Sequence, residues 1–200
     1  MYRATLLPIL VFGGVAAVGH SAATSQPSVP DRHGIQETEL SCFLRGATPE
    51  EAAERPSPLR TLSFSYEGGE ALLCYSAPSA RGREIMGKLV PFGEPWRTGA
   101  NEPTAIHLTG AISIGGVDLK PGSYAIYTVP GEDGWQFFLN SAYERWGIPI
   151  TDEVRATEVG SFIVAPAATD GMVEMLTFSH KDGAIVLEWE HTRLEISVGG

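Results

Sequence analysis

Apolar and polar residues alternate with a period of two through most of the chain beyond its N-terminal part. In the first such stretch, Leu62, Phe64 and Tyr66 alternate with small polar residues, which is typical of a strand with one buried face. Gly68 and Gly69 follow at once, and the apolar pattern returns after them. The two stretches and their glycine turn therefore predict a β-hairpin.

The same pattern recurs to the end of the chain, interrupted by turns rich in glycine and proline. It predicts further strands over residues 71–76, 104–109, 112–114, 124–129, 135–140, 162–165, 173–179, 184–190 and 193–198. Long helices do not alternate with these strands, which argues against a parallel α/β sheet. Many short strands joined by turns predict an all-β fold, an antiparallel β-sandwich of jelly-roll-like type, over residues 59–198.

The N-terminus has the pattern of an export signal. Arg3 precedes an apolar run over residues 6–18, which is too short to span a bilayer comfortably, and small residues follow it. We predict a signal peptide over residues 1–23, cleaved after Ala23, which places the protein in the periplasm or outside the cell without a stable membrane span. The alternative is an uncleaved membrane anchor.

Residues 24–58 are rich in Ser, Pro, Ala and Glu and have no sustained period, so they are predicted to form a flexible N-terminal segment. Within it, Thr48 is a good helix N-cap, Pro49 suits the first helical position, and acidic residues follow. A short helix is therefore expected there. The connection over residues 141–155 is irregular, with room for one helical turn.

The charge of the chain narrows the range of its binding partners. The 200-residue chain has a formal net charge of -10, which disfavours nucleic acid as a partner because phosphate backbones would be repelled.

The chain has two cysteines, Cys42 and Cys74. In an exported protein a disulfide between them is favoured, and it would join the N-terminal segment to an early strand. The alternative is two unrelated thiols, with Cys74 packed as a small apolar residue.

One long stretch, residues 81–104, interrupts the strand pattern. It is too long for a hairpin loop and too rich in Gly and Pro for a helix, and long ordered loops are often functional. Five of its residues are predicted to bind a small polar or carbohydrate-like ligand: Arg83, Trp96, Arg97, Asn101 and Glu102. Arginine offers a planar fork of donors, tryptophan stacks on sugar rings, and asparagine both donates and accepts.

The same residues also admit a structural interpretation. Arg97 would then pair with Glu102 or Glu188, and Asn101 would bond the backbone of its own loop, because a long loop has many backbone groups to satisfy. Both interpretations predict a non-catalytic binding or structural module of the cell envelope.

An enzyme is the alternative. Glu102, Glu188 and Glu190 could supply the carboxylate pair of a hydrolase acting on cell-envelope polymers, although nothing in their spacing sets the separation. His107 lies in an alternating strand at a position predicted to be exposed. The histidines have no ligand spacing with one another or with cysteine, and cofactor motifs are lacking, so no metal and no cofactor are predicted.

Several motifs in order resemble a known family. They include Gly-Lys-Leu-Val-Pro-Phe-Gly from Gly87, Trp-Arg-Thr-Gly-Ala-Asn-Glu from Trp96, Leu-Lys-Pro-Gly-Ser-Tyr-Ala-Ile-Tyr from Leu119, and Leu-Glu-Trp-Glu-His-Thr-Arg from Leu187. The chain resembles, over about residues 59–198, the exported bacterial proteins grouped as the domain of unknown function numbered 2911. The resemblance implies export and a β-rich domain, with no assigned activity. Ala77 and His191 depart from it, where the family often has Arg and Asn.

Overall fold

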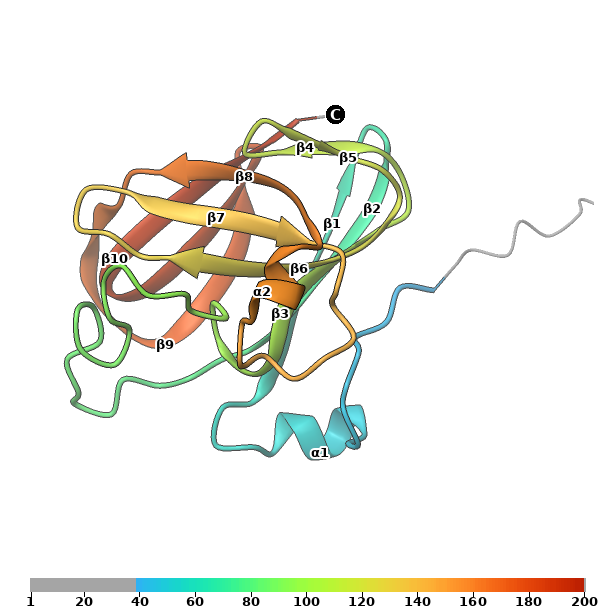
Figure 1. The fold of residues 1–200 in the computed structure, drawn as a ribbon. Coiled ribbons are helices and arrows are strands. Elements are labelled where there is room, and N and C mark those ends of the chain that lie inside the picture. Colours follow the sequence, from blue (N-terminus) through green and yellow to red (C-terminus); the bar gives the residue numbers. More distant parts are fainter. Residues whose placement is uncertain (1–38, 200) are drawn as a thin grey trace, which may run out of the picture. The chain divides into compact units, whose positions relative to one another are not determined.

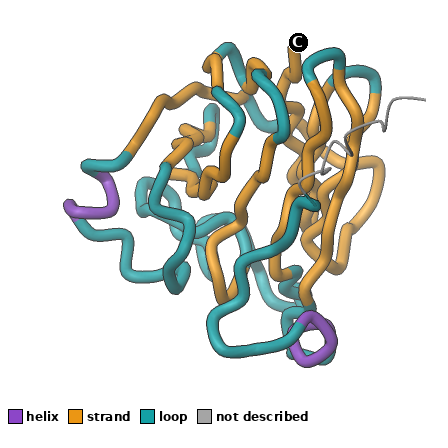
Figure 2. The backbone as a smooth tube through the Cα atoms, turned by 90° about the vertical axis from the view of Figure 1, so that its right-hand side faces the viewer, coloured by secondary structure: helices purple, strands orange, loops and turns teal. Residues whose placement is uncertain are grey.

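The structure is a computed structural model, and it describes residues 39–199. The predicted signal peptide over residues 1–23 and the beginning of the N-terminal segment lie outside the described residues. Strands make up most of the described chain, and two short helices are the only helical elements in that part (Figure 2).

Two antiparallel sheets form the domain (Figure 1). The larger has, in spatial order, β1 (Leu59–Tyr66), β2 (Gly69–Ser76), β3 (Ala100–Leu108), β6 (Gly122–Val129), β7 (Trp135–Asn140) and β8 (Glu158–Val164). The smaller has β5 (Val117–Leu119), β4 (Ile112–Ile114), β10 (Ala184–Gly199) and β9 (Ala167–Lys181). The sheets do not close into a barrel, which confirms the predicted all-β sandwich.

The core lies between the inner faces of the two sheets. Alternate residues of each strand point into it, such as Ile106 and Leu108 from β3 and Phe137 and Leu139 from β7. Trp189 enters the same cluster from β10, and all of these residues are almost completely buried. The period of two seen in the sequence therefore reflects the division between this core and the opposite sheet faces.

The bounds of β1 and β7 agree with the predicted strands, but the last part of the chain differs. The two strands predicted over residues 184–190 and 193–198 are one long strand, β10. Its pairing with β9 shifts register on both sides of Glu190, whose φ is 55°. Such an irregularity lets a strand bend and continue, so the break in the alternating pattern was a bulge and not a strand end.

Both helices begin with a threonine cap. In α1 (Pro49–Ala53) the Thr48 side chain accepts a hydrogen bond from the Glu51 N–H, and the Glu51 carboxylate accepts one from the Thr48 N–H. This reciprocal pair is the capping box that stabilises a helix start. The second helix, α2 (Asp152–Arg155), begins after Thr151 in the irregular connection between β7 and β8.

The second face of the larger sheet is covered as well. On this outer face lie Cys74, His107, Tyr127 and Asn140, and all four are buried. Two segments provide the cover: residues 39–58, and the connection over residues 141–157 that contains α2 (Figure 1). We refer to residues 39–58, the described part of the N-terminal segment, simply as the N-terminal segment, and to residues 141–157 as the β7–β8 connection.

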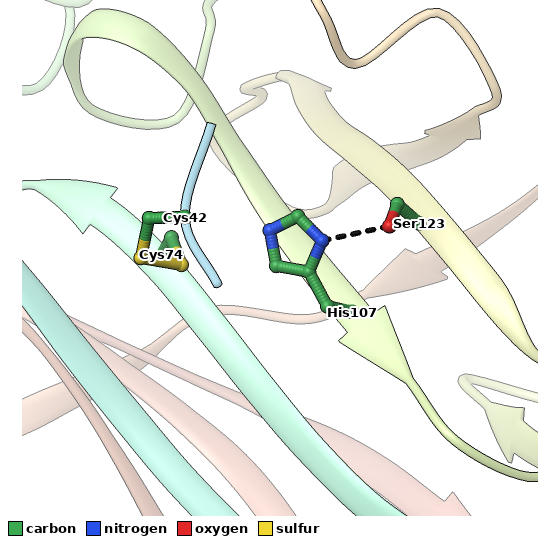
Figure 3. The surroundings of a disulfide bond; sticks show 4 residues. All are labelled: Cys42, Cys74, His107 and Ser123. Carbon is green, nitrogen blue, oxygen red and sulfur yellow. Dashed lines mark hydrogen bonds between the residues drawn. A yellow bond between two sulfur atoms is a disulfide. The ribbon is translucent and has the colours of Figure 1, made fainter. Parts of the chain in front are cut away.

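The predicted disulfide holds the N-terminal segment on this face. Cys42 and Cys74 are bonded, with their Cα atoms 5.7 Å apart (Figure 3). On the other side, the Asn140 side-chain oxygen accepts hydrogen bonds from the Ala142 N–H and the Thr157 hydroxyl, which ties both ends of the β7–β8 connection to the sheet. Within the described residues, none of the helices has the length and apolar character needed to cross a membrane.

The disulfide leads to the first prediction. It spans 32 residues, and a crosslink of that length stabilises a fold by about 3 kcal/mol through the unfolded chain. Reduction should lower the melting temperature by roughly 6–12 °C for a domain of this size, as measured by circular dichroism. A Cys42→Ser, Cys74→Ser variant is the control, and its melting temperature should not respond to reductant. Complete reduction without any change in the wild-type protein would contradict this expectation.

Candidate functional site

The long loop runs between β2 and β3 (Figure 1). Acidic side chains of the smaller sheet hold its first half. The Glu190 carboxylate accepts hydrogen bonds from the N–H groups of Ile85 and Met86, at 3.2 and 3.3 Å. The Glu174 carboxylate accepts from the Arg81 N–H at 2.7 Å. These bonds satisfy loop backbone groups that have no strand partner, so the loop is ordered by specific polar contacts.

Arg83 makes its side-chain hydrogen bonds to nearby backbone at the start of the loop. Its guanidinium donates to the carbonyl oxygens of Ser79 and Ala80, at 2.8 and 2.9 Å. The residue is otherwise exposed. No hydrogen bond among residues 39–199 connects it to the other four predicted site residues.

Trp96 packs with the core. Its ring stacks on Trp189 with centroids 5.9 Å apart and an angle of 18° between the planes, and it meets Trp135 edge-on at 5.9 Å. Its backbone N–H and C=O bond with the backbone of Thr128 on β6, at 2.7 and 2.8 Å. Aromatic contacts of this kind stabilise a core, and here they fix the second half of the loop against both sheets.

Asn101 and Glu102, at the start of β3, bind the N-terminal segment. The Asn101 amide donates to the Ser57 carbonyl and the Ser76 hydroxyl, both at 3.2 Å. Its φ is 56°, a left-handed conformation that asparagine tolerates better than most residues. Glu102 is 5% exposed; its carboxylate forms an ion pair with Arg55 at 2.7 Å and accepts from the Arg45 N–H at 3.1 Å.

The ion pairs expected from the structural interpretation are therefore different from those observed. Glu102 pairs with Arg55, and Glu188 pairs with Arg193 at 2.8 Å. Asn101 bonds the N-terminal segment and β2 instead of its own loop. Arg55 lies far from Glu102 in sequence, just after α1, so no local pattern indicated that it would be the partner.

Among the polar side chains of the predicted site, that of Arg97 has the fewest hydrogen-bond partners in the described residues. Its Nε donates to the Gly99 carbonyl at 3.4 Å, and within the described part of the chain it has no carboxylate at ion-pair distance. The side chain is half-buried, and this burial lowers the pKa of its guanidinium.

Gly147 of the β7–β8 connection packs against both Arg97 and Asn101. Its N–H donates to the Asn101 carbonyl at 3.0 Å. A Cβ at this position would lie 2.4 Å from the Arg97 Cδ and 2.5 Å from the Asn101 oxygen, so the close packing requires glycine. From the other side, Arg145 donates to the carbonyls of Trp146 and Gly147, both at 3.0 Å. The backbone at Gly147, against which the Arg97 side chain packs, is therefore held by several hydrogen bonds.

A second group of polar residues, on the outer face of the larger sheet, was not predicted as a site. His107 is 4% exposed, so the prediction that it is exposed was wrong. The alternating pattern places it correctly outside the core, but the N-terminal segment and the β7–β8 connection cover that face. Its Nδ1 lies 2.7 Å from the Ser123 hydroxyl on β6, and burial lowers the pKa of the imidazole.

Further along the same face, the buried Tyr127 hydroxyl donates to the Glu158 carboxylate. Burial, and then that hydrogen bond, raise the pKa of Tyr127 well above its usual range. Its ring stacks on Phe138 at 4.6 Å. The spacing of Tyr127 and Glu158 in the sequence did not predict this contact. Tyr127 is on β6 and Glu158 is on β8, and the two strands are near each other because both pair with β7.

The carboxylates considered for hydrolysis do not form a pair. Glu102 binds Arg55, Glu188 binds Arg193, and Glu190 binds loop N–H groups. Across residues 39–199, there is no group of three or more His, Cys, Asp or Glu side chains placed to hold a metal ion.

The fold and the site together define an antiparallel β-sandwich with a disulfide-linked N-terminal segment on its outer sheet face. The chain belongs to the family described as protein of unknown function (DUF2911), whose profile matches residues 57–198. This match confirms the family resemblance seen in the sequence. No curated protein matches the chain, and no solved structure does.

The partly buried ion pair of Glu102 and Arg55 leads to the second prediction. Glu102→Gln and Arg55→Ala should each lower the free energy of unfolding by about 1–3 kcal/mol, because each leaves a charged partner without its counterion. The double variant should lose less than the sum, with a coupling energy of about 1 kcal/mol or more in urea unfolding. Glu94→Gln, an exposed acid on the same loop, is the control. Additive losses would show that the pair does not hold the segment.

Proposed function

We propose that this protein is an exported, non-catalytic binding module of the cell envelope, and that it recognises a small polar or carbohydrate-like ligand at Arg97. One observation carries the proposal: Arg97 is half-buried on the long loop without a carboxylate partner among residues 39–199. Every other predicted site residue already has specific contacts within the fold.

A half-buried guanidinium without a counterion is costly, since the charge is partly removed from water and not compensated. A ligand that supplies hydroxyl, carbonyl or carboxylate oxygens would offset this cost. Arginine suits such a role because its planar fork can donate two parallel hydrogen bonds to one group. Within the described part of the chain, the five nitrogen-bound protons of Arg97 make one long hydrogen bond, to Gly99.

The surroundings of Arg97 support a preformed site. Asn101 and Glu102 fix the start of β3, and Gly147 packs against the Arg97 side chain. A guanidinium held by rigid neighbours loses less freedom on binding, which favours affinity for a small ligand. In this proposal Asn101, Glu102, Trp96 and Arg83 position the loop, and Arg97 contacts the ligand.

The disulfide supports export, because disulfides persist in oxidising compartments. We therefore place the protein in the periplasm or outside the cell. The hydrolase alternative gains no support from the geometry, since Glu102, Glu188 and Glu190 each bind a separate partner. The negative net charge disfavours nucleic acid as the ligand.

The third prediction tests the ligand site by thermal shift. Neutral monosaccharides, uronic acids, amino acids and dicarboxylates are added separately to the wild-type protein. A ligand at about 100 times its Kd stabilises by ~2.7 kcal/mol, which raises the melting temperature by roughly 5–10 °C for a domain of this size. Arg97→Ala should lose the shift. Arg60→Ala, an exposed arginine on β1, should keep it.

The outcome is decisive in either direction. If no member of the panel raises the melting temperature, or if Arg97→Ala responds as the wild type does, then Arg97 is not a ligand contact. The melting temperature of each variant without ligand shows whether a lost shift reflects lost binding or lost folding.

A further inference from the structure

A cavity lies on the outer face of the larger sheet, away from the long loop. Its volume is about 370 Å³. The N-terminal segment over residues 39–44 forms one wall, His107 and Ser123 form the floor, and Tyr143 and Glu144 form another wall. The disulfide at Cys42 fixes the first wall on the sheet (Figure 3). A volume of this size is at the lower end of ligand sites, so it suits a small molecule.

His107 lines this cavity and has one ring nitrogen that is not hydrogen-bonded within the described residues. Its Nδ1 faces the Ser123 hydroxyl, while its Nε2 is buried and has no hydrogen-bond partner among the described residues. Figure 3 shows the imidazole between β6 and the N-terminal segment, with its second nitrogen turned away from Ser123. Buried polar atoms are nearly always satisfied, so an unpartnered nitrogen on a residue that lines a cavity is free to accept a hydrogen bond from a bound molecule.

The charges around the cavity indicate the kind of ligand. Its lining contains two carboxylates, Glu39 and Glu144, and no lysine or arginine. Burial lowers the pKa of His107, so the ring is neutral near pH 7 and one of its nitrogens is an acceptor. When Nδ1 donates to Ser123, that acceptor is Nε2. Acceptors and negative charges without any cation repel anions and favour a donor with positive charge.

Aromatic side chains complete the lining. The Tyr143 ring lies edge-on to the His107 ring with centroids 5.6 Å apart, and edge-on to Phe43 at 6.4 Å. Its hydroxyl donates to the Glu144 carboxylate at 3.2 Å, which holds that carboxylate beside the ring. Aromatic ring faces attract cations, and nearby carboxylates attract them as well.

We propose that this cavity is a binding site for a small molecule that carries a primary ammonium group. The ammonium N–H donates to the Nε2 of His107, and Glu39 and Glu144 balance its charge. The site shares no contact residue with Arg97, and its ligand has the opposite charge preference, so the two proposals stand or fall separately.

Three compounds that share a four-methylene spacer and differ only in their end groups test the proposal. The disulfide-bonded protein is titrated by calorimetry with butane-1,4-diamine, butane-1,4-diol and hexanedioate at pH 7. The diamine should bind and the other two should not. The imidazole carbon and nitrogen signals of His107 should shift in NMR spectra during the diamine titration, and those of His180, which stacks on Phe64, should not.

Variants locate the bound diamine. His107→Phe removes the nitrogen acceptor and keeps an aromatic ring, so it should abolish diamine binding, while His180→Phe should not change it. Glu144→Gln, at an exposed position, should weaken binding by up to about fivefold, as expected for a partly solvated ion pair. Glu132→Gln, an exposed acid in the turn before β7, is its matched control.

Three results would overturn the proposal. One is equal affinity for the diol and the diamine, which would remove the preference for an ammonium group. Another is unchanged diamine affinity in both His107→Phe and Glu144→Gln, which would place the ligand elsewhere. The third is no heat of binding and no shift of the His107 signals at millimolar diamine.

Discussion

The attachment of the N-terminal segment to the outer face of the larger sheet is the constraint on which the polar sites of this protein depend. The disulfide from Cys42 to Cys74 and the ion pair from Arg55 to Glu102 hold the segment at two points far apart along its length. Together with the β7–β8 connection, the segment covers His107, which an uncovered sheet face would expose to water. The two segments therefore make the outer face of the larger sheet a second, partly polar buried layer.

The long loop depends on a different kind of constraint. A segment of this length has many backbone groups without strand partners, and their burial would be unfavourable unless other groups satisfied them. Glu174 and Glu190 from the smaller sheet accept several of the loop N–H groups, and Trp96 anchors the other end in the core. The loop is thus ordered by both sheets, which explains how a stretch rich in glycine and proline can hold defined side-chain positions.

Local patterns predicted the parts of the fold that local physics determines. The strands β1 and β7, the capped helix after Thr48 and the sandwich class all follow from alternation, capping and turn chemistry. The bulge at Glu190 broke the alternating pattern and so divided β10 in the prediction. Side-chain partners such as Arg55 for Glu102 could not be predicted, because their meeting depends on how a distant segment docks. The burial of His107 was missed for the same reason.

The two interpretations of the long loop, ligand site and structural clamp, turn out not to exclude each other. Asn101 and Glu102 bind the N-terminal segment and β2, so they act as a clamp. Because Glu102 is used by Arg55, it is not available to Arg97. Among residues 39–199 the clamp thereby leaves the half-buried Arg97 guanidinium without a carboxylate at ion-pair distance, packed against Gly147. In the function proposed above, a bound ligand supplies the oxygen atoms that the clamp withholds from Arg97.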